Sequence, residues 1–236
     1  MGTTIFFRMA AQDPDYLDRN VSTFIGLGPV IVPTNSTAPL VEATRHHHER
    51  LYKAFTSSFA GLYEIGEPTR FSNYAIGVIC GNLRLPCEGA LSMIASNERG
   101  LSDEDRFAVF MGHYPAGGST QVIFHYLQQM DRGEATVGFD YYDEVENMSK
   151  YGGEASPPML SMERLGELEL PMSLFVGQND ILSTPTDDRV IRDLIQPSAM
   201  HHYEEIEADH LSLLLGKDMT FWTERAMDIL QELHPL

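Results

Sequence analysis

The stretch LPMSLFVGQND, residues 170–180, together with the residues that follow it as far as His210, decides the fold class of this chain. Its apolar run predicts a buried strand over residues 170–176. A helix is predicted over residues 187–195 and a second strand over residues 201–206. A strand, a helix and a strand in succession are typical of a parallel sheet in an α/β fold.

Two residues with catalytic potential follow these two predicted strands. Asp180 comes directly after the first strand, and His210 comes shortly after the second. Because ligands and chemistry gather at the carboxyl ends of parallel strands, both side chains are expected at the same edge of the sheet. An aspartate that orients a histidine acting as general base makes up two thirds of a Ser-His-Asp triad. The order of aspartate before histidine is the one that follows the serine in α/β-hydrolases.

The rest of the chain separates into a core and a long insertion. Residues 3–12 predict a helix with Ile5, Phe6, Met9 and Ala10 on its apolar stripe, and residues 22–32 predict a strand. The segment from residue 34 to residue 165 is predicted to be mostly helical, with an aromatic and acidic loop over residues 141–158. We therefore predict a core formed by residues 1–33 and 166–236, interrupted by a helical cap formed by residues 34–165.

Composition limits the classes of partner. The 236 residues carry a formal net charge of −18 with neutral histidines, and 43% of them are hydrophobic. This charge excludes long-range attraction to nucleic acid or to an anionic membrane, although not binding to neutral lipid. No apolar run approaches the roughly 20 residues of a membrane-spanning helix, and the first residues of this chain do not have the pattern of a signal peptide.

Histidines and sequons supply the remaining candidates. His46, His47 and His48 are consecutive, so on a helix they point in different directions and predict a solvated face, with no metal site. For His113 and His125 a packed, structural role is favoured over catalysis. Three N-x-S/T triplets, candidates for glycosylation that also arise by chance, are at Asn20, Asn35 and Asn147.

The serine of a triad is missing from its expected setting. An α/β-hydrolase presents its serine in G-x-S-x-G, on a tight turn between a strand and a helix. No serine in this chain has that setting, and Ser119 in AGGSTQ lacks both the second glycine and a preceding strand.

Several motifs in a shared order resemble the acid lipases, the group that contains gastric and lysosomal lipases. They are FIGLGPVIV (24–32), HYPAGGSTQ (113–121), FDYYDEVENMSKYG (139–152), VGQNDILSTPTD (176–187) and ADHLSLL (208–214). In HYPAGGSTQ, Gly118 stands where the family usually has threonine. In that family the serine lies in G-H-S-Q-G, and this chain begins with Met1-Gly2-Thr3-Thr4 at the point that would follow the serine. The resemblance therefore predicts the C-terminal portion of such an enzyme, with an incomplete α/β-hydrolase core.

The resemblance implies a carboxylic ester hydrolase that acts on triacylglycerols or sterol esters at a lipid droplet or micelle surface. It implies Asp180 and His210 as triad members, a disulfide between Cys80 and Cys87, no cofactor, and a secreted or lysosomal, glycosylated protein. Because this chain supplies only the aspartate and the histidine, it is expected to be inactive alone. The alternative is a non-catalytic lipid-binding or decoy protein. Without the strand that precedes the serine, the strand at residues 22–32 would leave an open apolar edge, which predicts self-association.

Overall fold

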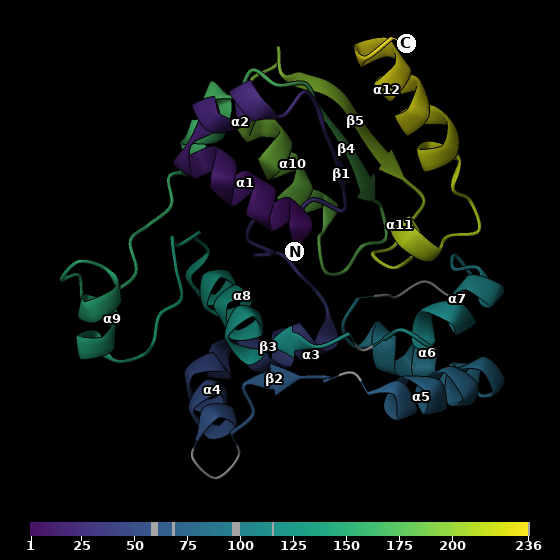
Figure 1. Cartoon of the computed structure of the whole chain (residues 1–236), viewed down its shortest axis with the longest axis horizontal. Helices are drawn as coiled ribbons and strands as arrows, with labels where there is room; N and C mark the ends of the chain where they lie inside the picture. The colour runs from purple at the N-terminus through teal and green to yellow at the C-terminus, as the bar shows by residue number, and fades with distance from the viewer. Residues whose placement is uncertain (58–60, 68, 96–99, 115, 236) are drawn as a thin grey trace. The chain divides into compact units, whose positions relative to one another are not determined.

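The computed structural model describes residues 1–57, 61–67, 69–95, 100–114 and 116–235 (Figure 1). The chain divides into two compact units. Unit 1 comprises Met1–Ser36, Ala95–Asp103 and Ser161–Leu236, and unit 2 comprises Thr37–Ile94 and Glu104–Leu160.

The elements of unit 1 are α1 (Gly2–Gln12), α2 (Pro14–Asn20), β1 (Phe24–Leu27), η2 (Met162–Glu167), β4 (Met172–Gly177), α10 (Pro185–Leu194), β5 (Met200–Ile206), α11 (Ser212–Leu215), η3 (Phe221–Ala226) and α12 (Met227–Leu233). Those of unit 2 are α3 (Pro39–Thr44), η1 (Arg45–His47), α4 (His48–Thr56), β2 (Glu64–Ile65), α5 (Arg70–Asn82), α6 (Arg84–Ser92), α7 (Glu104–Met111), β3 (Gly118–Ser119), α8 (Thr120–Arg132) and α9 (Glu144–Lys150). The segments η1 and η2 are 3₁₀ helices and η3 is a π-helical segment.

A three-stranded parallel sheet in the order β1-β4-β5 forms the centre of unit 1. Every residue of β4 is buried, as expected for a strand covered on both faces. The predicted strands and the predicted helix between them are all present, with α10 connecting β4 to β5. The parallel sheet and the predominance of helix elsewhere confirm the α/β class with a large, mostly helical insertion.

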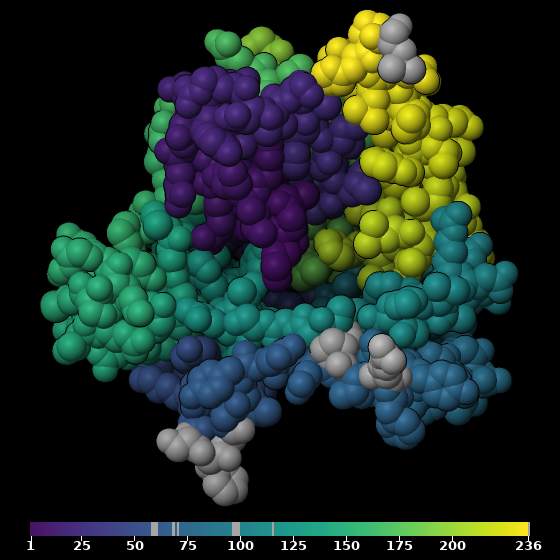
Figure 2. Space-filling model, in the orientation of Figure 1, coloured from purple at the N-terminus to yellow at the C-terminus, as the bar shows by residue number. Residues whose placement is uncertain are grey.

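Helices cover both faces of this sheet. On one face, Phe175 of β4 packs with Phe221, Ala226 and Ile229 from the C-terminal helices. Figure 1 shows α1, α2 and α10 on the other side of the sheet from α12. In the space-filling view of Figure 2, the N-terminal helices (purple) and the C-terminal helices (yellow) each form a continuous outer surface of unit 1.

Strand β1 is shorter than predicted. Residues 22–32 were expected to form one strand, but β1 ends at Leu27 because Gly28 adopts a left-handed conformation with φ of 52°. Val30 and Ile31 are buried beyond this turn without belonging to the sheet. The strand was predicted too long because the buried residues after the turn are as apolar as those of the strand itself.

The apolar stripe predicted for α1 was partly wrong. The helix buries Phe7, Ala10 and Ala11, whereas Ile5 and Met9 are 54% and 41% exposed. The ring of Phe7 meets the ring of Phe24 on β1 edge to face, which turns this face of the helix toward the sheet. The helix ends at Gln12, the last residue of the predicted range, and the carboxylate of the next residue, Asp13, caps α2.

Unit 2 is built around α8. Its buried Phe124, Leu127 and Met130 pack with Phe139, and the rings of Tyr52 and Phe139 lie 4.8 Å apart. Gly133 ends α8 with φ of 73°. The loop predicted over residues 141–158 was wrong in one part, because it contains α9, whose first turn is capped by the carboxylate of Asp143.

One segment of the predicted insertion packs with the core. Backbone hydrogen bonds join Asp103 to Leu215 and Lys217 to Leu101, so residues 95–103 belong to unit 1. No pattern in the sequence predicted that Leu101 and Asp103 pack with the core. In the described part of the chain, no helix combines the length and the apolar character that crossing a membrane requires.

We expect Gly177→Ala to destabilise the protein. An added Cβ would lie 2.6 Å from the carbonyl oxygen of Ala208 and 3.3 Å from Cβ of Asp180, so the backbone has to shift. The expected loss is about 1–3 kcal/mol in the free energy of unfolding, measured by urea denaturation. Gly89→Ala is the matched control, because a Cβ on this helical glycine meets nothing within 4 Å. Equal stabilities for the two variants would contradict the close approach at Gly177.

Self-association also stays a prediction. The strand order places β1 at one edge of the sheet, where a second strand could pair with it. Sedimentation of the isolated chain is expected to give dimers or larger species that increase with concentration. A monomer with a sharp, cooperative thermal transition would contradict this expectation.

Candidate active site

The site at the carboxyl edge of the sheet begins with Asp180. Strands β4 and β5 pair in parallel up to Gly177 and Ile206, and backbone hydrogen bonds continue this pairing into the loops, from Gln178 to Ile206 and from Asn179 to Ala208. The turn after β4 is therefore held against the turn after β5. Asp180 lies in this turn with 3% of its surface exposed.

Both oxygens of the Asp180 carboxylate are held by donors. The backbone N–H groups of Leu182 and Ser183 each donate to Oδ1 at 2.8 Å. Oδ2 lies 2.8 Å from Nδ1 of His210. Two backbone donors and an imidazole stabilise the charged form of a buried carboxylate and fix its orientation.

His210 presents its second nitrogen for chemistry. Its side chain is 30% exposed, in contrast to the fully buried side chain of Asp180. With Nδ1 directed at Asp180, the neutral ring carries its proton on Nδ1 and leaves Nε2 as the acceptor. Within the described ranges no residue forms a hydrogen bond with Nε2. The structure therefore brings together the two residues that the sequence singled out.

Gly28 is a site residue that the sequence analysis missed. A Cβ built on it would lie 2.9 Å from Cδ1 of Leu213 and 3.5 Å from both Oδ2 of Asp180 and Nδ1 of His210. Its left-handed φ and this close approach both require glycine. The only signal in the sequence was a glycine before a proline within an apolar run.

The described serines of this region are engaged elsewhere. Ser183 Oγ contacts the carbonyl oxygen of Pro29 at 2.6 Å, and Ser212 Oγ lies 2.6 Å from the backbone N–H of Asp209. Ser119 belongs to β3 of unit 2. Pro115, part of the motif around Ser119, lies outside the described residues.

The sequence also predicted a disulfide and three candidate glycosylation sites. Cys80 at the end of α5 and Cys87 in α6 form a disulfide. Of the sequon asparagines, Asn20 is exposed and Asn35 donates its side-chain amide to Asp187, whereas Asn147 is 2% exposed.

Two histidines of unit 2, His46 and His48, share one carboxylate. His46 Nδ1 and His48 Nε2 lie 2.6 and 3.4 Å from the two oxygens of Asp131, while His47 is exposed. His125 contacts Thr136 Oγ1 at 3.1 Å, which fits the structural role predicted for it. Among the described residues no group of three or more potential ligands could hold a metal ion.

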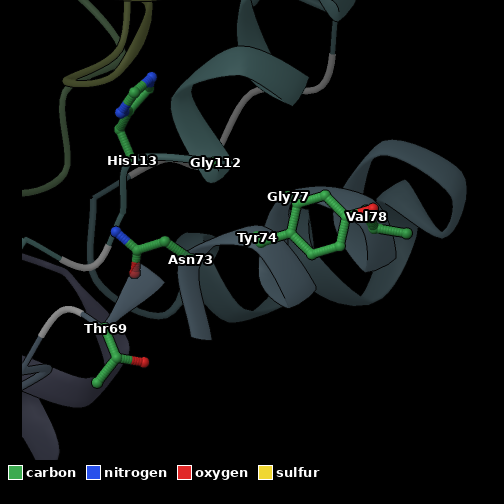
Figure 3. Close-up of a pocket in the computed structure, with 7 residues that line it drawn as sticks. All are labelled: Thr69, Asn73, Tyr74, Gly77, Val78, Gly112 and His113. Carbon is green, nitrogen blue, oxygen red and sulfur yellow. The ribbon is translucent and has the colours of Figure 1, made fainter. Parts of the chain in front are cut away.

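His113 does not have the packed environment predicted for it. It is exposed at one end of an open hollow of about 580 Å³ in unit 2, which Figure 3 shows with the residues that line it. Among these, Tyr74 is 72% exposed, and Asn73 Oδ1 is buried with no hydrogen-bond partner among the described residues.

No family model matches the chain, but curated proteins do. A protein of Crotalus adamanteus named "Putative lysosomal acid lipase/cholesteryl ester hydrolase" is 29% identical over 220 residues. The human gastric triacylglycerol lipase is 26% identical over 220 residues. Each match covers 92% of this chain and 52% of the relative, so the chain spans about half the length of the curated relatives that it matches.

Among solved structures, a soluble variant of monoglyceride lipase from Saccharomyces cerevisiae is similar with a TM-score of 0.49 and 14% identity, over 98% of this chain and 58% of that one. The sequence matches, which extend through the motifs of both site residues, confirm the predicted resemblance: over nearly all of its length this chain is similar to the gastric and lysosomal acid lipases.

Proposed function

We propose that this chain carries the aspartate and the histidine of a carboxylic ester hydrolase of the acid-lipase type. The observation that supports this most directly is the 2.8 Å contact between Asp180 Oδ2 and His210 Nδ1. Asp180 is buried and bound by two backbone N–H groups, whereas His210 is partly exposed. An oriented imidazole with a free nitrogen is the arrangement that activates a hydroxyl nucleophile.

In this mechanism His210 transfers the protons and Asp180 holds the ring. Nε2 accepts the proton of a serine hydroxyl as its oxygen attacks the ester carbonyl carbon, and the imidazolium then gives that proton to the departing alcohol. In the second half of the reaction, His210 Nε2 accepts a proton from a water molecule as the water oxygen attacks the acyl-enzyme. The imidazolium then returns this proton to the serine oxygen, and the carboxylic acid is released. The negative charge of Asp180 stabilises the imidazolium in both steps. No nucleophilic serine and no oxyanion donors are assigned to the described residues in this mechanism.

The proposed substrates are neutral lipid esters, triacylglycerols or sterol esters, presented at a droplet or micelle surface. The names of the relatives, gastric triacylglycerol lipase and lysosomal acid lipase/cholesteryl ester hydrolase, support this class. A net charge of −18 also favours a neutral surface over an anionic one. In this proposal residues 34–165 act as the cap of the enzyme.

Replacing His210 tests the proposal. In the longest reading frame that contains this chain, His210→Ala is expected to lower the turnover of a triacylglycerol emulsion by about 10⁴-fold or more, because the proton acceptor is lost. Asp180→Asn is expected to have a similar effect, since the imidazole loses its orientation. His47→Ala is the matched control, because His47 is an exposed histidine of unit 2.

Retained activity in the His210→Ala protein would refute the assignment. If the unaltered reading frame binds lipid emulsions but hydrolyses no ester, the non-catalytic lipid-binding alternative is the better description.

A secreted or lysosomal location leads to a prediction about glycosylation. The amide of Asn147 donates to Asp140 Oδ1 at 3.0 Å and to the carbonyl oxygen of Ala155 at 2.9 Å, so a glycan there is incompatible with the buried site. Asn20 is exposed at the end of α2. After expression in a secretory cell, Ser22→Ala is expected to remove one glycan, seen as a gel shift, and Ser149→Ala none. A shift with Ser149→Ala would contradict this.

A further inference from the structure

A second buried carboxyl group lies next to the pair and has no part in the proposed chemistry. Asp188, in the first turn of α10, is 0% exposed. Its Oδ2 has no hydrogen-bond partner among the described residues, and no described residue forms an ion pair with it. A buried carboxylate without a compensating charge is costly, so the environment favours the neutral acid.

Counting hydrogen-bond donors leads to the same protonation state. Ser183 Oγ lies 2.6 Å from the carbonyl oxygen of Pro29 and 2.9 Å from Asp188 Oδ1. A hydroxyl group has one proton to donate, and a carbonyl oxygen can only accept. When Ser183 donates to Pro29, which is the shorter contact, Asp188 has to be the donor to Ser183. The chain of hydrogen bonds runs from Asp188 to Ser183 and from Ser183 to Pro29.

The surrounding charges also favour a proton on Asp188. Burial raises the pKa of its carboxyl group to about 9. The negative charges of Asp180, Asp187 and Glu205, which come from the turn after β4, from α10 and from β5, raise it further. Tyr203 on β5 faces the same group.

Ser183 connects this buried acid to the site. Its backbone N–H donates to Oδ1 of Asp180, while its side chain joins the turn after β1 at Pro29 to α10 at Asp188. The turn after β1 includes Gly28, which approaches the contact between Asp180 and His210. One serine thus ties together three segments that surround the Asp180 carboxylate.

We propose that a protonated Asp188, acting through Ser183, is a positioning residue that keeps Asp180 and His210 aligned. Its importance for catalysis rests on the proposed function, but the alignment itself is a property of this chain. A neutral acid serves this purpose because it donates a hydrogen bond without placing a second negative charge beside Asp180.

Ionisation of Asp188 would make the alignment of Asp180 and His210 sensitive to pH. Its pKa is raised in the folded protein above the ordinary value of 3.8, so between this value and about pH 9 the folded form holds a proton that the unfolded form releases. The contribution of Asp188 to stability is therefore greatest in acid and falls as the pH rises through this window.

The first test compares the thermal stability of Asp188→Asn with that of the unaltered chain. Asparagine keeps the size and a hydrogen-bond donor but does not ionise, so its melting temperature is expected to rise relative to the unaltered chain by several degrees between about pH 5 and about pH 8. Asp193→Asn, at the exposed end of the same helix, is the control and is expected to show no such trend. A difference that is independent of pH would overturn the protonated state.

The second test follows the imidazole of His210 by NMR. Asp188→Asn is expected to leave the midpoint of the His210 titration unchanged, because one neutral group replaces another. Loss of an ionised neighbour would lower that midpoint by about half a unit or more and would overturn the proposal. Ser183→Ala removes the hydroxyl that contacts Pro29 and Asp188, so the backbone N–H that binds Asp180 is held less firmly. The signal of the His210 Nδ1 proton is therefore expected to shift or broaden. An unaltered signal would refute the positioning role.

Neither measurement depends on ester hydrolysis. An inactive long reading frame would count against the proposed function and leave both results interpretable. Conversely, if the enzyme is active but its Ser183→Ala variant keeps the His210 signal, the proposed function stands and the positioning role is refuted.

Discussion

The parallel pairing of β4 with β5 is the constraint on which the rest of the site depends. It extends beyond the strands through the backbone hydrogen bonds of Gln178 and Asn179, so two turns that are 30 residues apart in the chain meet at one edge. Gly177 lies so close to the Ala208 carbonyl that a Cβ on it would be 2.6 Å from the carbonyl oxygen. Asp180 and His210 meet because the backbone around them is already paired. Their hydrogen bond is a consequence of this pairing and also stabilises it.

The sequence predicted this part well for a physical reason. The run before Gly177 is buried on both faces, so its apolar composition marks a strand without ambiguity. The helix predicted over residues 187–195 is present as α10, which begins at Pro185. Asp180 and His210 could be named because each follows a predicted parallel strand, where chemistry gathers in α/β folds, and because they occur in the order of a triad. The prediction succeeded here because a run that is apolar in the sequence is also buried in the folded sheet.

The features that were missed depend on contacts between distant segments. The face that α1 buries is chosen by Phe24, and Gly28 ends β1 because its backbone passes beside the pair. Neither choice is visible in periodicity, since Ile5 and Phe7 are equally apolar and a glycine before a proline is common in loops. Likewise, Leu101 and Asp103 join the core through backbone hydrogen bonds, which no side-chain pattern specifies.

Asp180 and Asp188 illustrate how one edge can hold two carboxyl groups in different roles. Asp180 receives two backbone N–H groups and an imidazole, all of which are donors that favour a charge. Among the described residues, the Asp188 carboxyl group forms a hydrogen bond only with a hydroxyl whose proton is directed to a carbonyl oxygen, so Asp188 is the group that has to donate. In a chain with 34 acidic and 16 basic residues, neutralising the second carboxyl by protonation requires no additional cation in the core. Such a solution becomes more favourable in acid, so the stability of this edge depends on pH.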